Sequence, residues 1–217
     1  MSIEEIYVKN AYNKIAKEFS NTRYRPWTCV ENFMDSLPKK SIIGDIGCGN
    51  GKNMNYRNDC EFIGCDFSEE LVKICKNKKL NVVYGDILNI PFENNYFTHT
   101  ICIAVIHHLS TIEKRKQAIR ELLRITKNNG EIFILVWALE QGNDSKRKFN
   151  QQINYVDWKD KKGNILHKRY YYMFRENELE SLIPDDCIIK HKFYEKGNWG
   201  IIIKKPLVRM NTLLKNP

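Results

Sequence analysis

The sequence predicts one α/β domain, with a mostly parallel sheet and an antiparallel hairpin at its C-terminal end. Strand and helix patterns alternate along residues 41–140, which favours parallel strands joined by right-handed crossovers. Three of the expected strands end in an aspartate, at the sheet edge where open α/β folds bind ligands. A chain of 217 residues can bury a sizeable core but is short for two domains.

The N-terminal segment, 1–40, is expected to hold two helices. Apolar residues recur at helical spacing over 3–19 and again over 29–37, where Pro38 ends the pattern. The polar, aromatic loop between these helices is placed beside the substrate.

The core segment, 41–140, is expected to contain five strands with helices between them. The apolar runs predict strands at 41–45, 62–66, 81–86, 101–106 and 131–138. Ser68 is expected to cap the helix after the second strand. The sequence Ser110–Glu113 matches a capping box that begins another helix, and Asn128–Gly130 is expected to end it because these residues tolerate positive φ.

Most of the net charge of +9 lies in the next segment, 141–175. From residue 144 onward it contains nine Lys or Arg and three Asp residues, interleaved with aromatic residues. It is expected to be a basic aromatic insertion. The last segment, 176–217, is expected to form a short helix at 176–182 and a hairpin of strands at 187–194 and 200–204.

The composition indicates a folded, soluble protein, with 42% hydrophobic and 28% charged residues. No apolar run is long enough for a membrane span, and the N-terminus lacks a basic region followed by an apolar stretch. The seven cysteines show no zinc-ligand spacing, so we expect reduced thiols and no metal site. These observations predict a cytoplasmic protein, with the nucleus as a second location.

A glycine-rich turn, Asp45-Ile-Gly-Cys-Gly-Asn-Gly51, follows the first strand. Its glycines, Gly47, Gly49 and Gly51, allow a tight turn and close approach of a ligand. A dinucleotide site favours Gly-x-Gly-x-x-Gly, because a pyrophosphate must meet a helix N-terminus. The spacing here, with acidic Asp45 beside it, suits cationic S-adenosylmethionine better. A dinucleotide site and a turn without a ligand are the alternatives.

Carboxylates at the ends of the next two strands extend this expected cofactor site. Asp66 is placed to accept bonds from ribose hydroxyls, and Asp86 from an adenine amino group, with Ile87 packed on the ring. Taken alone, Asp86 is equally typical of a cap or turn. Three carboxylates at successive strand ends are more specific than any one of them.

The fourth strand runs into Ala104-Val-Ile-His-His108, the next position along the same edge. We expect Ala104 at the cofactor. Adjacent side chains point in different directions, so one histidine is expected to face the cleft and the other to pack or cap. The alternative is that both histidines are structural.

Together these motifs resemble those of class I methyltransferases. The quoted residues are Asp45–Lys52, Gly64-Cys-Asp66, Gly85-Asp86 and Ile103–Leu109. The resemblance implies a Rossmann-like fold with a mostly parallel seven-stranded sheet, an antiparallel C-terminal hairpin and S-adenosylmethionine as cofactor, in a single methyltransferase domain spanning 1–217.

Other segments are similar to the eukaryotic tRNA wobble-uridine carboxymethyl methyltransferases. They are Phe19–Trp27, Val136–Gln141, Arg169–Phe174 with Glu178-Leu179, and Gly197-Asn-Trp199. This resemblance implies methyl esterification of 5-carboxymethyluridine at the wobble position of tRNA. It also implies a heterodimer with a small zinc-binding activator subunit, and the compact chain is similar to the free-standing form of the catalytic subunit.

The expected nucleophile is a carboxylate oxygen, which is already ionised at neutral pH, so no general base is needed. His107 is therefore expected to position groups. An arginine fork can hold one carboxylate oxygen, and Arg23, Arg25 and Arg169 are the candidates. Contacts with tRNA phosphates or exposure to solvent are their alternatives. Trp137 and Tyr170 are expected to stack on the uracil, although a tryptophan at a strand end is also common in cores.

The basic segment is expected to bind RNA, with charges for phosphates and rings for unstacked bases. The candidates are Lys146, Arg147, Lys148, Lys161, Lys162 and Lys168. The alternative is an ordinary solvated surface.

In the strand order usual for the fold, the third strand lies at a sheet edge. Val82, Val83 and Tyr84 are strong strand formers, so we expect the activator to add a strand here. The alternative is a loop that covers the edge of an independent monomer.

Two other functions remain open from the sequence. One is a methyltransferase for a small carboxylic acid or another metabolite, which leaves the basic aromatic segment unexplained. The other is a non-catalytic RNA-binding subunit, which the complete cofactor edge argues against.

Overall fold

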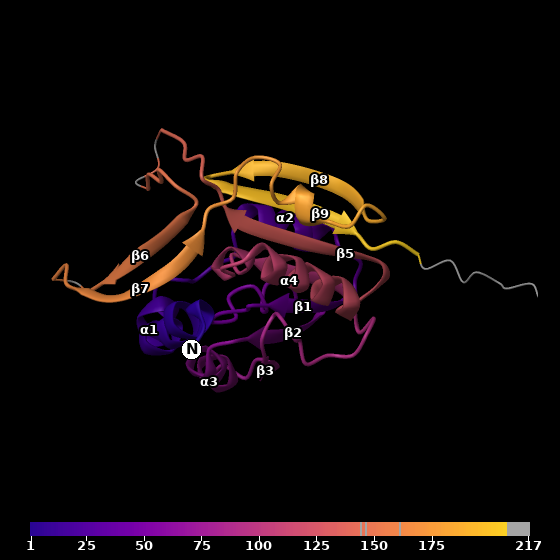
Figure 1. Ribbon diagram of the computed structural model, residues 1–217. Coiled ribbons are helices and arrows are strands. Elements are labelled where there is room, and N and C mark those ends of the chain that lie inside the picture. Colours follow the sequence, from indigo (N-terminus) through magenta and orange to yellow (C-terminus); the bar gives the residue numbers. More distant parts are fainter. Residues whose placement is uncertain (144, 146, 161, 208–217) are drawn as a thin grey trace, which may run out of the picture.

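A computed structural model gives the structure of the chain and describes residues 1–143, 145, 147–160 and 162–207. Figure 1 shows a central sheet flanked by helices, with a two-stranded hairpin projecting from one end. The seven strands of the sheet have the order β3-β2-β1-β4-β5-β9-β8. The pairs from β3 to β5 are parallel, whereas β9 pairs antiparallel with both β5 and β8. The expected fold class is confirmed.

The central sheet consists of β1 (Ile42–Ile46), β2 (Glu61–Asp66), β3 (Val82–Tyr84), β4 (Phe97–Ile103), β5 (Thr126–Trp137), β8 (Ile188–Glu195) and β9 (Asn198–Lys204). The separate hairpin consists of β6 (Ile153–Lys159) and β7 (Ile165–Tyr172). The α-helices are α1 (Asn10–Ser20), α2 (Thr28–Ser36), α3 (Glu69–Asn77) and α4 (Ile112–Ile125). A π-helical turn, η1 (Glu5–Lys9), precedes α1, and two 3-10 turns are η2 (Ile106–His108) and η3 (Glu180–Leu182).

Helices cover both faces of the sheet, and each face has its own apolar cluster. One cluster joins α4 to residues such as Ile132 and Ile134 of β5. The other joins α2 and α3 to Phe133 and Leu135, the intervening residues of the same strand. Because successive side chains of a strand point to opposite faces, a strand buried on both faces must be apolar throughout. Within the described residues, no helix is long and apolar enough to cross a membrane.

The helix boundaries at α4 differ from the expected ones because of tertiary contacts. Thr111 caps the helix by accepting a bond from Lys114 N, while the hydroxyl of Ser110 donates to Glu4 Oε1 at 2.7 Å. The helix ends at Ile125, and β5 begins at the next residue. Asn129 has the expected positive φ, +65°, but it lies inside β5 and does not end the helix.

The helix expected at 176–182 is wrong, and only the turn η3 forms there. Asn177 has a φ of +62°, which interrupts a right-handed helix. The carboxylate of Glu178 accepts bonds from Arg175 N and from the side chain of Gln152, and so ties this segment to the start of β6.

The basic segment forms the β6–β7 hairpin, which the sequence analysis did not predict. Its strands pair antiparallel from Ile153–Tyr172 to Trp158–His167. The hairpin is not part of the central sheet, and it contacts η1, α1 and η2 beyond the carboxyl ends of the parallel strands. It therefore forms a wall beside the edge where the sequence placed the site.

Candidate active site

Two adjoining cavities lie at the carboxyl ends of the parallel strands. Tyr12, Gly47 and Ala104 line both cavities and so mark their junction. Residues at the first cavity include Glu4, Val8, Lys9, Gly49, Asp66, Ser68, Gly85, Asp86, Ile87, Val105 and His108. Residues at the second cavity include Phe19, Arg23, Trp27, Cys48, Lys52, Asn53, His107, Trp137, Arg169 and Tyr171.

The glycine-rich turn after β1 separates the two cavities. Gly47 has a φ of +77°, and a Cβ at this position would lie 2.2 Å from a methyl group of Val105. The position therefore admits only glycine without displacement of its surroundings. The amide of Gly49 donates to Asp66 Oδ2 at 2.7 Å, which ties the turn to the end of β2.

Asp66 and Asp86 lie where the sequence placed them, at the first cavity. Asp66 also accepts from the amide of Ser68 at 2.8 Å. Burial raises the pKa of Asp66, and the bonds from the backbone amides oppose this shift. Asp86 Oδ1 accepts from Leu88 N at 2.9 Å, which directs the loop after β3 past the cavity with Ile87 at its wall.

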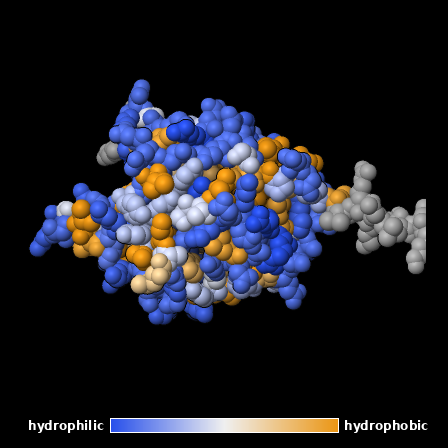
Figure 2. Space-filling view, in the orientation of Figure 1, coloured by the Kyte–Doolittle hydropathy of each residue, from blue (hydrophilic) through white to orange (hydrophobic). Residues whose placement is uncertain are grey.

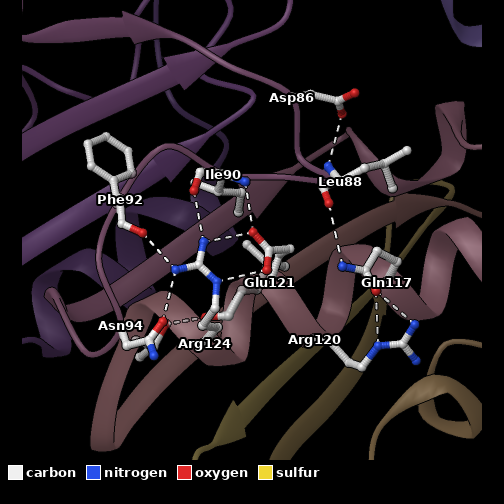
Figure 3. A network of polar contacts seen from close by, with 11 residues as sticks. Asp86, Leu88, Ile90, Phe92, Asn94, Gln117, Arg120, Glu121 and Arg124 are labelled. Atoms are coloured by element: carbon white, nitrogen blue, oxygen red, sulfur yellow. Dashed lines mark hydrogen bonds and ion pairs between the residues drawn. The ribbon is translucent and has the colours of Figure 1, made fainter.

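A network of polar contacts holds this loop against α4 (Figure 3). Glu121 accepts from Ile90 N at 2.8 Å, and Arg124 donates to the carbonyls of Ile90 and Phe92. Glu121 and Arg124 also form an ion pair at 2.7 Å. The side chains of one helix therefore fix the backbone that presents Asp86 and Ile87.

The N-terminal residues cover the first cavity, a role that the sequence did not reveal. Glu4 accepts bonds from Ser110 N and Oγ and forms an ion pair with Lys114 at 2.6 Å. Burial alone would raise the pKa of Glu4, but the bonds from Lys114 and Ser110 outweigh it and lower the pKa to about 2. Lys9 bonds to the hydroxyl of Tyr84 and pairs with Glu69. These contacts connect η1 with α4, β3 and α3.

Asp45 lies beneath the glycine-rich turn and is almost fully buried. Its Oδ2 accepts from Asn53 Nδ2 at 3.2 Å, but neither Asp45 Oδ1 nor Asn53 Oδ1 has a hydrogen-bond partner among the described residues. Burial raises the pKa of Asp45 to about 7. Two buried acceptors without donors call for a ligand that donates, and a cationic donor satisfies both.

The two histidines after β4 face different cavities. His107 lines the second cavity, and its Nδ1 accepts from Trp137 N at 3.0 Å, which leaves the proton on Nε2. His108 lines the first cavity, donates from Nδ1 to the carbonyl of Tyr170 and contacts the Tyr12 hydroxyl through Nε2. Burial lowers the pKa of His108 to about 3 and that of His107 well below its usual value. Both rings are therefore neutral at physiological pH.

Hydrogen bonds connect the two cavities through Tyr12. Arg169 Nη1 donates to the Tyr171 hydroxyl at 2.9 Å, which lies 3.3 Å from the Tyr12 hydroxyl. Tyr12 in turn contacts His108. The chain of bonds fixes the side chains on both sides of the junction.

Among the described residues, the cationic side chains that line the second cavity are Arg23, Lys52 and Arg169. Lys52 directly follows the glycine-rich turn and lies over the ring of Trp27 at 4.6 Å. Burial and the charge of Arg23 lower its pKa. Arg169 is 6% exposed, and its Nε is a buried donor without a partner among the described residues. An unpaired guanidinium donor beside a cavity calls for an anionic acceptor.

Comparison with known proteins identifies the family. Residues 44–134 match a family described as a methyltransferase domain. The chain is 40% identical over 225 residues to the tRNA (carboxymethyluridine(34)-5-O)-methyltransferase of Schizosaccharomyces pombe, an alignment that covers 93% of this chain and 97% of that one. The chain belongs to this family. The protein of the same description from Saccharomyces cerevisiae is 41% identical over 71% of this chain and 57% of its own length.

Solved structures confirm the class I methyltransferase fold. An S-adenosylmethionine-dependent methyltransferase from Methanosarcina mazei superposes with a TM-score of 0.65 at 16% identity, covering 84% of this chain and 99% of that one. A Haloferax volcanii protein, solved as a complex with the Trm112 methyltransferase activator, gives a TM-score of 0.61 at 12% identity, covering 93% of this chain and 99% of that one.

The family uses S-adenosylmethionine, and the residues present fit this cofactor. The first cavity offers the carboxylates of Asp66 and Asp86 and the apolar side chain of Ile87 for an adenosine. The unpaired oxygens of Asp45 and Asn53 suit the ammonium of the methionine end. Ala104, with a φ of +62°, lines both cavities at their junction.

Three predicted site residues have a different role or position. Gly51 lines neither cavity, and a Cβ there would lie 2.3 Å from Leu80, so this glycine serves packing. The side chain of Arg25 is 84% exposed and pairs with Glu31 outside both cavities. Tyr170 packs edge-on against Tyr155, and its neighbour Tyr171 lines the cavity instead.

Trp137 lines the second cavity, but its ring is already stacked. Tyr171 lies parallel to it at 4.3 Å, and the Arg147 guanidinium lies 3.9 Å from the ring centre. Two groups stacked this closely occupy opposite faces of the indole, so neither face is free for the expected uracil in this arrangement.

The lysines expected to bind RNA lie around the hairpin. Lys148, Lys162 and Lys168 are exposed, whereas Lys146 and Lys161 lie outside the described residues. The third strand lies at a sheet edge as expected. Val82 is buried there, Val83 is half-buried and Tyr84 is 43% exposed.

Proposed function

We propose that this chain transfers the methyl group of S-adenosylmethionine to the carboxylate of 5-carboxymethyluridine at position 34 of tRNA, forming the methyl ester. The observation that carries the proposal is a set of unpaired buried atoms at and behind the second cavity. Asn53 and Arg169 line this cavity, and Asp45 lies beneath the glycine-rich turn, bonded to Asn53. Within the described residues, Asp45 and Asn53 each have an oxygen without a donor, and Arg169 Nε has no acceptor. A cofactor ammonium and a substrate carboxylate satisfy these groups.

The positions of the cations suggest that different cations bind the carboxylate of the cofactor and the carboxylate of the substrate. Arg23 and Lys52 lie beside the glycine-rich turn, so we assign them to the carboxylate of the methionine moiety. Arg169 lies on β7, across the cavity, and we assign it to the substrate carboxylate. Its Nη1 is held by Tyr171, so the Nε edge of the guanidinium remains for the substrate.

The neutral histidines fit this chemistry. The cofactor supplies an electrophilic methyl group, and an ionised carboxylate attacks without losing a proton. With pKa values well below 7, His107 and His108 carry no charge to compete with Arg169. The protonated Nε2 of His107 is a donor that can orient the uridine. The residues thus act by holding and aligning the reacting groups.

The direct test is incubation of the chain with S-adenosylmethionine and tRNA that carries 5-carboxymethyluridine, with a Trm112-type activator present. Mass spectrometry of the digested nucleosides should show the methyl ester of that nucleoside. The matched control is tRNA with unmodified uridine at position 34, which should remain unchanged. Methylation of a nucleoside other than carboxymethyluridine would refute the proposed substrate.

We assign the exposed lysines of the hairpin to contacts with tRNA phosphates. Reversal of charge at Lys148, Lys162 and Lys168 should weaken tRNA binding and flatten the dependence of log K on log salt concentration, because fewer counterions are released. S-adenosylmethionine affinity should not change. A salt slope equal to that of the wild type would place the RNA elsewhere.

We also propose that a zinc-binding activator adds a strand beside β3. Asn81 O and Gly85 N bond to β2, so alternation directs the backbone groups of Val83 to β2 as well. The N–H and C=O groups of Val82 and Tyr84 therefore face the free edge. Such an edge is a template for strand addition, and the flanking α3 offers a surface next to it.

The variant Tyr84→Pro removes one amide donor from this edge and should reduce co-purification of a Trm112-type activator at least about tenfold. Tyr84→Ala is the matched control, because it removes the same side chain but keeps the amide, and it should retain the partner. The two variants are compared by pull-down from cells that express both proteins. Equal capture by Tyr84→Pro and the wild type would contradict strand addition at β3.

A further inference from the structure

Trp158 differs from the other three tryptophans in its surroundings. Trp27, Trp137 and Trp199 each belong to a hydrophobic cluster or pack against one, whereas Trp158 belongs to none. It is half-buried on the projecting β6–β7 hairpin. Among the described residues, its one close ring contact is the Arg169 guanidinium, 5.0 Å from the ring centre. A large aromatic side chain without apolar packing is costly to expose and suits a binding surface.

Strand alternation places Trp158 on the face of the hairpin that lines the second cavity. Val156 pairs with Arg169 and Asn154 with Tyr171, and both Arg169 and Tyr171 line that cavity. Trp158 pairs with His167, the next same-face position outward. Two residues of a strand span about 7 Å, so the Trp158–His167 pair lies just beyond the mouth of the cavity.

The charge around this pair is positive. Arg169 covers one face of the Trp158 ring, and no aromatic ring within the described residues stacks on the indole. Partial burial and the positive charge of Lys14, from α1, lower the pKa of His167. The acidic residue of this strand, Asp157, points to the opposite face and pairs there with Lys168. Figure 2 shows the hairpin as a projection whose surface is mainly hydrophilic, with hydrophobic residues among them.

We propose that Trp158, with His167 beside it, is a stacking subsite for the nucleobase adjacent to the wobble uridine. The inference rests on the proposed function, because it needs uridine 34 in the second cavity. A base that enters the cavity must leave its stack in the anticodon loop, and its neighbour then exposes a ring face. The free face of Trp158 receives that ring, and Arg169 connects the subsite to the carboxylate. Stacking does not depend on base identity, so the subsite accepts different neighbouring bases.

The test uses anticodon stem–loop RNA with 5-carboxymethyluridine, a Trm112-type activator and three variants. Trp158→Ala should raise KM for the RNA about 5- to 100-fold, with smaller effects on kcat. Trp158→Phe should stay within about threefold of the wild type, because a ring is retained. Leu166→Ala is the control, since it removes an exposed apolar side chain from the same hairpin, at the bulge beside the Trp158–His167 pair. S-adenosylmethionine affinity and thermal stability should be unchanged in all three.

Abasic RNAs identify the base that stacks. Removal of the base on one side of uridine 34 should raise the KM of the wild type as much as Trp158→Ala does. The same removal should not raise the KM of the Trp158→Ala variant further. The subsite would be overturned if the effects of the variant and of the missing base on KM were additive with both abasic RNAs. It would also be overturned by a KM for Trp158→Ala within twofold of the wild type (about 0.4 kcal/mol). If the wild type leaves the stem–loop unmethylated, the proposed function fails as well. Methylation by the wild type with an unaffected Trp158→Ala rejects the subsite alone.

Discussion

Replacement of Arg169 by alanine is expected to lower kcat/KM for carboxymethyluridine tRNA by about 100- to 10,000-fold. Two effects combine: loss of charged hydrogen bonds of about 1.5–3 kcal/mol each, and loss of the alignment of the attacking oxygen. Arg169→Lys should also be impaired, because an ammonium cannot hold Tyr171 and a carboxylate in the same fork geometry. S-adenosylmethionine affinity should stay within about threefold, since other side chains bind the cofactor.

Calorimetry with the cofactor and steady-state kinetics with tRNA separate these effects. Arg25→Ala is the matched control, because Arg25 was an equal candidate by sequence but lies exposed against Glu31. It should leave the chemical step unchanged. A folded Arg169→Lys variant with the same kcat/KM as the wild type would show that the substrate carboxylate is held elsewhere, with Arg23 as the next candidate.

The second large effect is expected at Asp45, where cofactor binding and stability should respond in opposite directions. Asp45→Asn removes the charge without changing the shape, so the affinity for S-adenosylmethionine should fall about 10- to 100-fold. The ligand-free variant should be at least as stable as the wild type, because a buried unpaired carboxylate is removed. Both quantities can be measured by calorimetry and by thermal unfolding.

The pH dependence provides the control for Asp45. Its folded-state pKa of about 7 lies above the unfolded value, so ionisation of this group costs stability. That cost is absent below the unfolded pKa near 4, grows as pH rises and is complete above about pH 7. An ammonium ligand prefers the ionised form, so wild-type affinity should fall about tenfold from pH 8 to pH 6. Asp45→Asn should lack this fall between pH 8 and pH 6. A wild-type affinity that is independent of pH would show that Asp45 does not bind the ammonium of the cofactor.

The fold and the cofactor edge could be predicted from local patterns. Asp66 ends β2 and Asp86 follows the end of β3 by two residues, and the carboxyl ends of parallel strands necessarily share one edge. The glycines of the turn are required by the backbone itself, as the φ of +77° at Gly47 illustrates. Such features depend on residues close together in the chain, which is why the sequence alone suffices.

Which residues line the second cavity, the one assigned to the substrate, depends on contacts between distant segments. Nothing near Tyr170 and Tyr171 in sequence indicates which ring enters the cavity, because that depends on the register of β7 against β6. Arg23, Arg25 and Arg169 were equivalent by residue type, and only their surroundings distinguish an exposed ion pair from a buried unpaired donor. The roles of Tyr12 and Glu4 could not be predicted from sequence patterns, because their partners, His108 and Ser110, lie about a hundred residues away along the chain.

By itself, the sequence determined the α/β class, the cofactor turn, the carboxylate edge and the resemblance to wobble-uridine methyltransferases. The tertiary structure decided which arginine is buried without a partner, which histidine faces which cavity, and which strand groups remain free at β3. The physical reason is the range of the interactions. Turn conformation and strand periodicity are set by neighbouring residues, whereas burial, pKa shifts and unpaired donors are set by whatever the fold brings alongside.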